Sequence, residues 1–231
     1  MILTDFLKAL SQLPDRAFRS VLLRGIGLTV LLFVAIYWVF VTGVGWFIGD
    51  SLTLPWIGEI SWIDKAISLA AVPLMLVLSV FLMVPVASAI TSMFLDDVAQ
   101  AVEDRHYPSL GPAQPVPFSD ALRDSVGFLG VLIGANLVAL ILYLMFAPFA
   151  PFIFWALNGF LLGREYFTLA AMRRVGRDGA RSLRRKHALT IWMAGILMAM
   201  PLTVPLINLL VPVLGAATFT HLFHRLSAKH G

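Results

Sequence analysis

The sequence predicts an all-α integral membrane protein with two long transmembrane helices, two membrane-dipping helical hairpins and an N-terminal amphipathic helix. Of the 231 residues, 59% are hydrophobic and only 13% are charged, whereas soluble domains carry about 25% charged residues. The apolar residues also cluster in long runs, which indicates lipid as the solvent. Prolines interrupt these runs in the C-terminal half at intervals too short for ordinary spans. We therefore expect a single membrane domain over residues 1–231.

The amino-terminal segment is predicted to form an amphipathic helix over residues 1–13. Its apolar residues fall on one face at helical spacing, namely Ile2, Leu3, Phe6, Leu10 and Leu13. The segment lacks the basic start, apolar run and cleavage site of a secretory signal, so we expect it to stay in the mature protein. Two placements fit the pattern: the helix lies on the membrane surface, or it packs on the protein itself.

Two apolar runs are long enough to cross a bilayer. Residues 25–48 carry no charge, and as a helix they extend roughly 36 Å, more than a hydrocarbon core of about 30 Å. Residues 66–90 are interrupted only by Pro73 and Pro85, which membrane helices tolerate. We expect long helices over 16–49 and 62–104. The second should project from the membrane with Asp96, Asp97, Glu103 and Asp104 in water.

The C-terminal half is predicted to form two hairpins that each enter and leave the membrane on the same side. A proline-rich loop at 107–117 precedes it. The first hairpin, 118–175, turns at Pro148 and Pro151, and the second, 182–226, turns at 201–205 and is broken again by Pro212. Most of their arms have about 10–14 residues, which is too short for full spans. Gly159 and Gly163 form a small-xxx-small pair that lets another helix approach closely.

The distribution of charge predicts the orientation. Lysines and arginines concentrate before the first span and in the loop between the hairpins, within residues 173–186. The connection over 50–65 is richer in acids. By the positive-inside rule, the termini and the basic loop are cytoplasmic, and the protein is multi-pass. This placement also explains the net charge of +4 without any nucleic-acid partner.

Two arginines at the start of the first long helix form the first candidate site. Arg16 and Arg19 are three residues apart and share a face beside the free backbone N–H groups of a helix start. The planar guanidinium group suits a tetrahedral oxyanion. The alternative is that both arginines set the topology and contact lipid headgroups.

The hairpins hold a second set of candidates. Arg164 and Glu165 end an apolar arm, and ionisable residues at membrane depth are candidates for function. A pair that snorkels to the interface and anchors the hairpin is the alternative. Irregular backbone around the prolines at 201–212 fits either a transport path or a hairpin tip buried in an oligomer. The putative-pore set is Asn158, Arg164, Glu165 and Asn208.

Catalysis, cofactors and metals have no support in the sequence. There is no cysteine, no phosphate-binding loop, no Gly-x-Ser-x-Gly and no His-Glu-x-x-His pattern. His221 and His224 are three residues apart, but no third ligand lies nearby, so interfacial histidines are the favoured interpretation. We expect neither an enzyme nor a metalloprotein.

Four segments carry a resemblance to a known family. They are the turn 14–19, the helix segment 92–97, and the stretches 158–166 and 205–217, of which the last is the most specific. The chain resembles the CysZ sulfate permeases, within the wider etoposide-induced-protein-like domain family, from Phe6 to Leu226.

The resemblance implies two long spans and two hemi-penetrating hairpins. It also implies uptake of sulfate or sulfite across the bacterial inner membrane for cysteine biosynthesis, by a homo-oligomer built from dimers. The family's anion site is a Gly-Leu-Arg type turn, which corresponds here to Arg19, with Arg16 one turn before it. In this chain the glycine is missing and Asp15 places a negative charge nearby.

The sequence thus predicts an inner-membrane sulfate or sulfite permease. The alternatives are a non-transporting scaffold that shapes the bilayer and a transporter of another anion. The substrate, the choice between channel and carrier, the energy coupling, the oligomer number and single or dual topology stay open.

Overall fold

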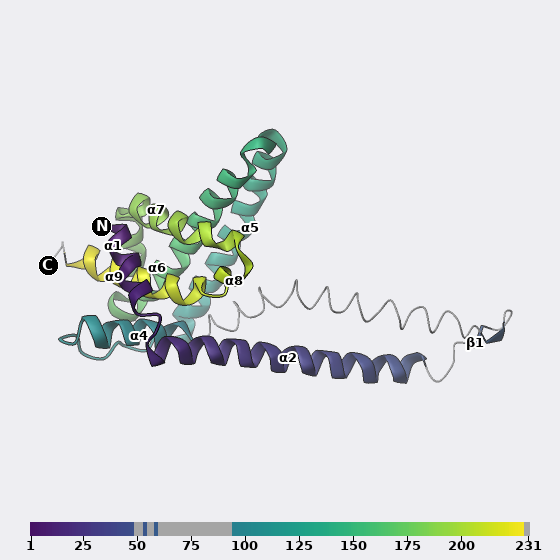
Figure 1. Cartoon of the computed structure of the whole chain (residues 1–231). Helices are drawn as coiled ribbons and strands as arrows, with labels where there is room; N and C mark the ends of the chain where they lie inside the picture. The colour runs from purple at the N-terminus through teal and green to yellow at the C-terminus, as the bar shows by residue number, and fades with distance from the viewer. Residues whose placement is uncertain (49–52, 55–57, 60–93, 229–231) are drawn as a thin grey trace. The chain divides into compact units, whose positions relative to one another are not determined.

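A computed structural model of the chain describes residues 1–48, 53–54, 58–59 and 94–228 (Figure 1). The chain divides into two compact units, residues 1–22 with 91–231, and residues 23–90. The expectation of one membrane domain stays a prediction. Within the described residues the chain is almost entirely helical, which confirms the predicted all-α class, while the membrane-dipping hairpins and the amphipathic helix stay predictions.

The first unit is a bundle of helices around the last one. Its elements are α1 (Ile2–Ser11), the start of α2 (Arg16–Ile48), α4 (Leu95–His106), α5 (Phe118–Met145), the 3₁₀ turn η1 (Ala147–Phe149), α6 (Ala150–Lys186), α7 (Ala188–Ala199), η2 (Met200–Thr203), α8 (Pro205–Asn208) and α9 (Val211–Ser227). Every residue from 211 to 223 is buried. Helix α9 (yellow in Figure 1) packs against α1, α4, α6 and α7 and forms the centre of the core.

The second unit contains the remainder of α2 and a minimal antiparallel ladder. Strand β1 (Thr53–Leu54) pairs with β2 (Gly58–Glu59), with Thr53 opposite Glu59. Most of the predicted helix over 62–104 lies outside the described residues. The part of this predicted helix that the structure describes is its C-terminal end, which lies in α4.

Among the described residues, two helices have the length and composition of membrane spans. Arg16–Trp38 has a mean hydropathy of 2.1 and Phe118–Met145 has one of 2.4. Only 17% and 6% of the most apolar stretch of each is buried, whereas the core helix of a soluble protein is mostly covered. The exposed leucines and isoleucines of α5 make this helix a candidate membrane span.

The first pair of arms is a helical hairpin, and its second arm has a break at Gly176, next to the predicted end at residue 175. Helices α5 and α6 pack side by side on either side of η1, and Pro151 lies in the first turn of α6, where proline removes no helical hydrogen bond. Helix α6 continues to Lys186 through a kink at Gly176, whose φ of 67° suits only glycine. The predicted basic loop between the hairpins is therefore wrong, since this segment is helical.

Helices α6 and α7 approach so closely that only glycine fits at three contact positions. A Cβ atom at Gly159 would lie 2.6 Å from the backbone nitrogen of Ile196, and one at Gly163 would lie 2.7 Å from the carbonyl oxygen of Ile191. A Cβ atom at Gly195 would meet the carbonyl oxygen of Gly159. The close approach predicted for the Gly159–Gly163 pair is confirmed, and α7 is the partner helix.

The second pair of arms turns through η2 and α8. Helix α8 ends at Asn208 and α9 begins at Val211, so the predicted arm over 206–219 is two helices. The predicted break at Pro212 is therefore confirmed to within a few residues: the chain leaves the helix at 209–210, and Pro212 lies in the first turn of α9. Proline is favoured there, since its missing N–H would have no helical acceptor.

Helix α1 confirms that the amino-terminal segment is helical. Ile2 and Phe6 pack against the core, and Asp5 pairs with Arg225 of α9 at 2.7 Å. Leu3 and Leu7 are 58% and 52% exposed. One face of α1 thus packs on the protein, while its placement on a membrane surface stays a prediction.

Candidate anion site and charged clusters

The start of α2 is fixed in the core while its two arginines are exposed. Phe18 is fully buried and Val21 is 1% exposed, and both belong to the hydrophobic core. Arg16 and Arg19 lie one turn apart on the exposed side. Within the described residues, neither guanidinium group contacts a carboxylate. Both cations are therefore available to an anion.

The acidic residue beside these arginines is neutralised. Both carboxylate oxygens of Asp15 accept hydrogen bonds from Arg105 of α4, at 2.5 and 2.6 Å. The backbone N–H of Arg19 donates to the carbonyl oxygen of Asp15 at 3.0 Å, which closes the first turn. The negative charge of Asp15 is thus compensated by a residue far away in the sequence, and the start of α2 keeps its net positive field.

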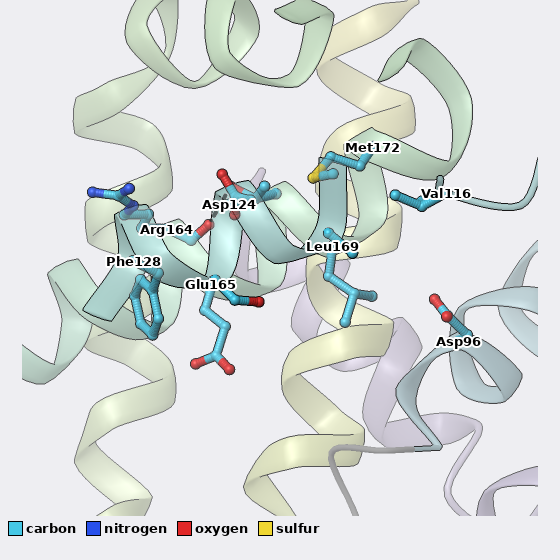
Figure 2. Close-up of a pocket in the computed structure, with 11 residues that line it drawn as sticks. Asp96, Val116, Asp124, Phe128, Arg164, Glu165, Leu169 and Met172 are labelled. Carbon is cyan, nitrogen blue, oxygen red and sulfur yellow. Dashed lines mark hydrogen bonds between the residues drawn. The ribbon is translucent and has the colours of Figure 1, made fainter. Parts of the chain in front are cut away.

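A cavity of about 270 Å³ lies between α5, α6 and the start of α4 (Figure 2). Asp96, Asp124 and Glu165 contribute carboxylates to its lining, and Arg164 contributes a cation. Apolar side chains such as Leu169 and Met172 complete the wall. The excess of carboxylates gives the cavity a field that opposes anions.

The two adjacent residues Arg164 and Glu165 line this cavity but point apart, as Figure 2 shows. The Arg164 guanidinium lies 5.7 Å from the centroid of the Phe128 ring, a cation–π distance. Glu165 is exposed. The two side chains thus share a cavity without pairing.

The two asparagines of the putative-pore set do not join Arg164 and Glu165 in this cavity. Asn158 donates its amide N–H to the carbonyl oxygen of Phe154, one turn earlier on α6, at 2.8 Å. Asn208 ends the short helix α8 and is partly buried. The role of all four residues in a transport path stays a prediction.

A buried ion-pair cluster was missed by the sequence analysis. Glu103 of α4 is 2% exposed, so its predicted place in water is wrong. Its carboxylate accepts two hydrogen bonds from Arg174, at 3.0 and 2.7 Å, and lies 2.9 Å from Nε2 of His224. Arg173 lies 3.5 Å away and also donates to Gln100 at 2.7 Å. The cluster therefore ties α4 to α6 and α9.

The surroundings of Glu103 determine its charge. Burial by itself raises the pKa of Glu103, but the hydrogen bonds from His224 and Arg174 and the charges of Arg173 and Arg174 outweigh burial. The net result lowers the pKa to about 2. Glu103 is thus an anion that compensates the buried Arg173 and the partly buried Arg174.

Histidine and tyrosine side chains extend this cluster towards α1. The Tyr107 hydroxyl lies 3.1 Å from Nδ1 of His221, and the Tyr107 ring packs on His224 at a centroid distance of 4.2 Å. Burial, followed by the charges of His106 and Lys8, lowers the pKa of His221 to about 3. His221 is therefore neutral at physiological pH. Its contacts are aromatic and hydrogen-bonded, and the described residues hold no group of three side chains suited to a metal.

The signal for Glu103 was present in the sequence. Leu95, Val98, Ala99 and Val102 form the buried face of α4, and Glu103 follows Ala99 by four residues, so it shares that face. An acidic residue on a buried helical face requires a cationic partner.

The family follows from a comparison of the whole chain with family models. The model described as "Sulfate transporter CysZ/Etoposide-induced protein 2.4" matches residues 5–212. The chain belongs to this family. The match covers the start of α2, both hairpin arms of α5 and α6, and the Glu103 cluster up to Arg174. Comparisons with curated proteins and with solved structures gave no match.

Membership of this family is consistent with the exposed apolar surfaces of α2 and α5. A membrane protein of the sulfate transporter type has at least some helices that face lipid, and α2 and α5 meet that requirement. The family is one of transporters rather than enzymes.

Proposed function

We propose that this protein is an inner-membrane permease for sulfate or sulfite that feeds cysteine biosynthesis. The observation that carries the proposal is the family match over residues 5–212, together with two exposed arginines at the start of α2. Arg19 captures the anion and Arg16, one turn before it, adds a second guanidinium group. Backbone N–H groups at the helix start complete the shell of donors.

The compensation of Asp15 supports this site. An uncompensated carboxylate beside Arg16 and Arg19 repels a divalent oxyanion, and at 4 Å two unit charges near a protein surface interact with about 4 kcal/mol. Arg105 removes most of that repulsion by its two hydrogen bonds to Asp15. This chain lacks the glycine of the family's turn, but the guanidinium groups of Arg16 and Arg19 and the backbone N–H groups of the helix start are present without it.

Beyond the capture site, the proposed route passes the residues of the hairpins, namely Asn158, Arg164, Glu165 and Asn208. Arg164 is the cation of this set, and it offsets part of the repulsion from the carboxylates that line the same cavity. The protein is proposed to be a multi-pass homo-oligomer built from dimers, with cytoplasmic termini in a bacterial inner membrane.

The experiment that tests the function is uptake of radiolabelled sulfate into proteoliposomes of the purified protein. Sulfite and phosphate serve as competitors. We expect saturable uptake that sulfite inhibits and phosphate does not. Uptake no greater than that of empty vesicles, for a folded and monodisperse protein, contradicts the proposal.

A bilayer-shaping scaffold is the second candidate. It is favoured by the exposed apolar face of α1, with Leu3, Leu7 and Leu10, and by the separation of Asn158 and Asn208 from the cavity. A scaffold predicts that the protein changes the curvature or size of vesicles without moving sulfate. The uptake experiment, with vesicle size measured in parallel, separates the two functions.

A further inference from the structure

Three arginines gather at one end of the contact between α6 and α7. Arg164, Arg184 and Arg185 line a pocket of about 160 Å³ together with Trp192. Arg184 donates to the Thr168 hydroxyl at 2.6 Å, which holds its guanidinium group in place. In the described parts of the chain, none of the three arginines lies within ion-pair distance of a carboxylate.

Positive charge is concentrated in this pocket and is only partly offset, by Asp124. Burial, followed by the charge of Arg164, lowers the pKa of Arg184, although Asp124 opposes this effect. Arg181 and Arg185 lower it further. Like charges held this close together are stabilised when an anion binds between them.

An apolar groove adjoins the arginine pocket. It lies between α5 and α6, has a cavity volume of about 710 Å³ and is lined by apolar residues that include Gly134, Ala139, Ala156 and Phe160. Phe160 and Trp192 line both the groove and the arginine pocket, so the two are continuous. The indole N–H of Trp192 donates to the carbonyl oxygen of Ala156 at 2.8 Å, which fixes the ring at the junction.

The dimensions of the groove match one leaflet of a bilayer. Phe152 lines its far end near the hairpin turn, and Arg164 lies in the pocket at the other end. At about 1.5 Å per residue these positions are about 18 Å apart along α6, and half of a hydrocarbon core is about 15 Å. Tryptophan and arginine are the residues that favour the boundary between the acyl chains and the headgroups.

We propose that this continuous surface is a binding site for one anionic phospholipid. The headgroup phosphate binds Arg184 and Arg185 with Arg164, and an acyl chain lies in the groove between α5 and α6. A free oxyanion uses only the arginines and leaves the groove empty, whereas a phospholipid uses both parts. The proposal is independent of sulfate transport, since it needs only that the hairpin dips into the membrane.

Native mass spectrometry of the purified full chain tests the site. Phosphatidylglycerol and phosphatidylcholine with identical acyl chains are titrated into the detergent-solubilised protein. We expect phosphatidylglycerol to bind about tenfold more tightly, which is the size expected for a charge-assisted contact. An excess of sodium sulfate is added in a parallel series, and we expect it not to displace the lipid.

Two pairs of variants separate the headgroup from the acyl chain. Arg184→Gln with Arg185→Gln should abolish the preference for phosphatidylglycerol. Arg123→Gln with Lys8→Gln removes two charges from exposed positions outside the pocket and should keep it. Gly134→Leu fills the groove and should weaken the binding of both lipids. Gly127→Leu adds the same side chain two turns away on α5, where it also has open space, and should change nothing.

The folding of each variant is checked by size-exclusion chromatography and circular dichroism. A variant that misfolds is replaced by the corresponding alanine variant. Equal binding of the two lipids by the wild type overturns the proposal. Displacement of the lipid by sulfate also overturns the proposal, because the arginines then bind a free oxyanion. If Gly134→Leu dissociates an oligomer and leaves lipid binding unchanged, the groove is an interface between copies and the proposal is wrong.

Discussion

Helix α6 carries two groups of arginines with opposite surroundings. Arg173 and Arg174 lie against the buried carboxylate of Glu103, at 3.5 and 2.7 Å. Arg164 and Arg184 lie in a pocket without a paired carboxylate in the described chain. The residue type is the same, but a compensated arginine is part of the fold, whereas an uncompensated one can bind an anion that comes from outside.

The same distinction applies to α2. Arg105 is compensated by Asp15, and Arg16 and Arg19 are not paired within the described residues. The account therefore predicts large losses of stability where a compensated cluster is broken, and losses of binding where an uncompensated arginine is removed.

The largest effect on stability is expected at Glu103. Glu103→Ala leaves Arg174 without its carboxylate and Arg173 with only the exposed Asp96, 3.6 Å away, and breaking a buried ion pair in this way costs about 3–5 kcal/mol. The apparent melting temperature in detergent, measured by circular dichroism, should fall strongly. Asp104→Ala removes an exposed carboxylate from the next position and should cost no more than about 0.5 kcal/mol. Equal melting temperatures for the two variants contradict the role of the cluster.

The pH dependence of stability tests the same carboxylate. The pKa of Glu103 is lowered from 4.5 to about 2, so its stabilisation is complete above about pH 4.5 and is lost as the pH falls towards 2. The buried neutral His221 acts in the same direction, since the unfolded chain gains its proton below about pH 6.5. Thermal melts over this range should show a decline that Glu103→Gln makes shallower. A parallel decline in that variant argues against Glu103.

Smaller losses are expected where helices α6 and α7 touch. Gly195→Ala places a methyl group against the carbonyl oxygen of Gly159, and overpacking of this kind costs about 1–3 kcal/mol. Gly130→Ala adds the same methyl group to α5 in open space and should be neutral or slightly stabilising, because alanine favours helices. Chemical or thermal unfolding of both variants decides whether the close approach is as described.

The smallest effect on stability is expected at Arg105, and its effect on transport is expected to be larger. The Arg105–Asp15 pair is partly exposed, with side chains 52% and 30% accessible, so Arg105→Gln should cost less than about 1 kcal/mol. It leaves Asp15 uncompensated beside Arg19 and should reduce sulfate uptake. The double variant Arg105→Gln with Asp15→Asn should restore uptake. Failure of this rescue means that Asp15 does not act on the anion.

The sequence was sufficient for the parts of the fold that depend on local pattern. Run lengths predicted the long helix that contains residues 25–48, the prolines predicted the turn at 147–151, and the Gly159–Gly163 pair predicted the close approach of a helix. Each of these depends on a few neighbouring residues and on the geometry of a single helix.

The parts that depend on distant partners were not predictable in the same way. The burial of Glu103 depends on Arg174, and the compensation of Asp15 depends on Arg105, at separations of 71 and 90 residues. The helical continuation of α6 past Gly176 was missed because a basic, glycine-containing stretch is typical of a loop. Arg16 and Arg19 were chosen by residue type and position, and their role in binding sulfate stays a prediction.

Equilibrium binding of radiolabelled sulfate to the purified protein tests the central claim most directly. Arg19→Gln is compared with Arg123→Gln, which removes an equal charge from an exposed position on α5. A hydrogen bond to a charged group contributes about 1.5–3 kcal/mol, so we expect Arg19→Gln to weaken sulfate binding by about tenfold or more, and Arg123→Gln to leave it unchanged. Equal affinity in the wild type and Arg19→Gln would contradict the claim that the uncompensated arginines at the start of α2 capture the anion.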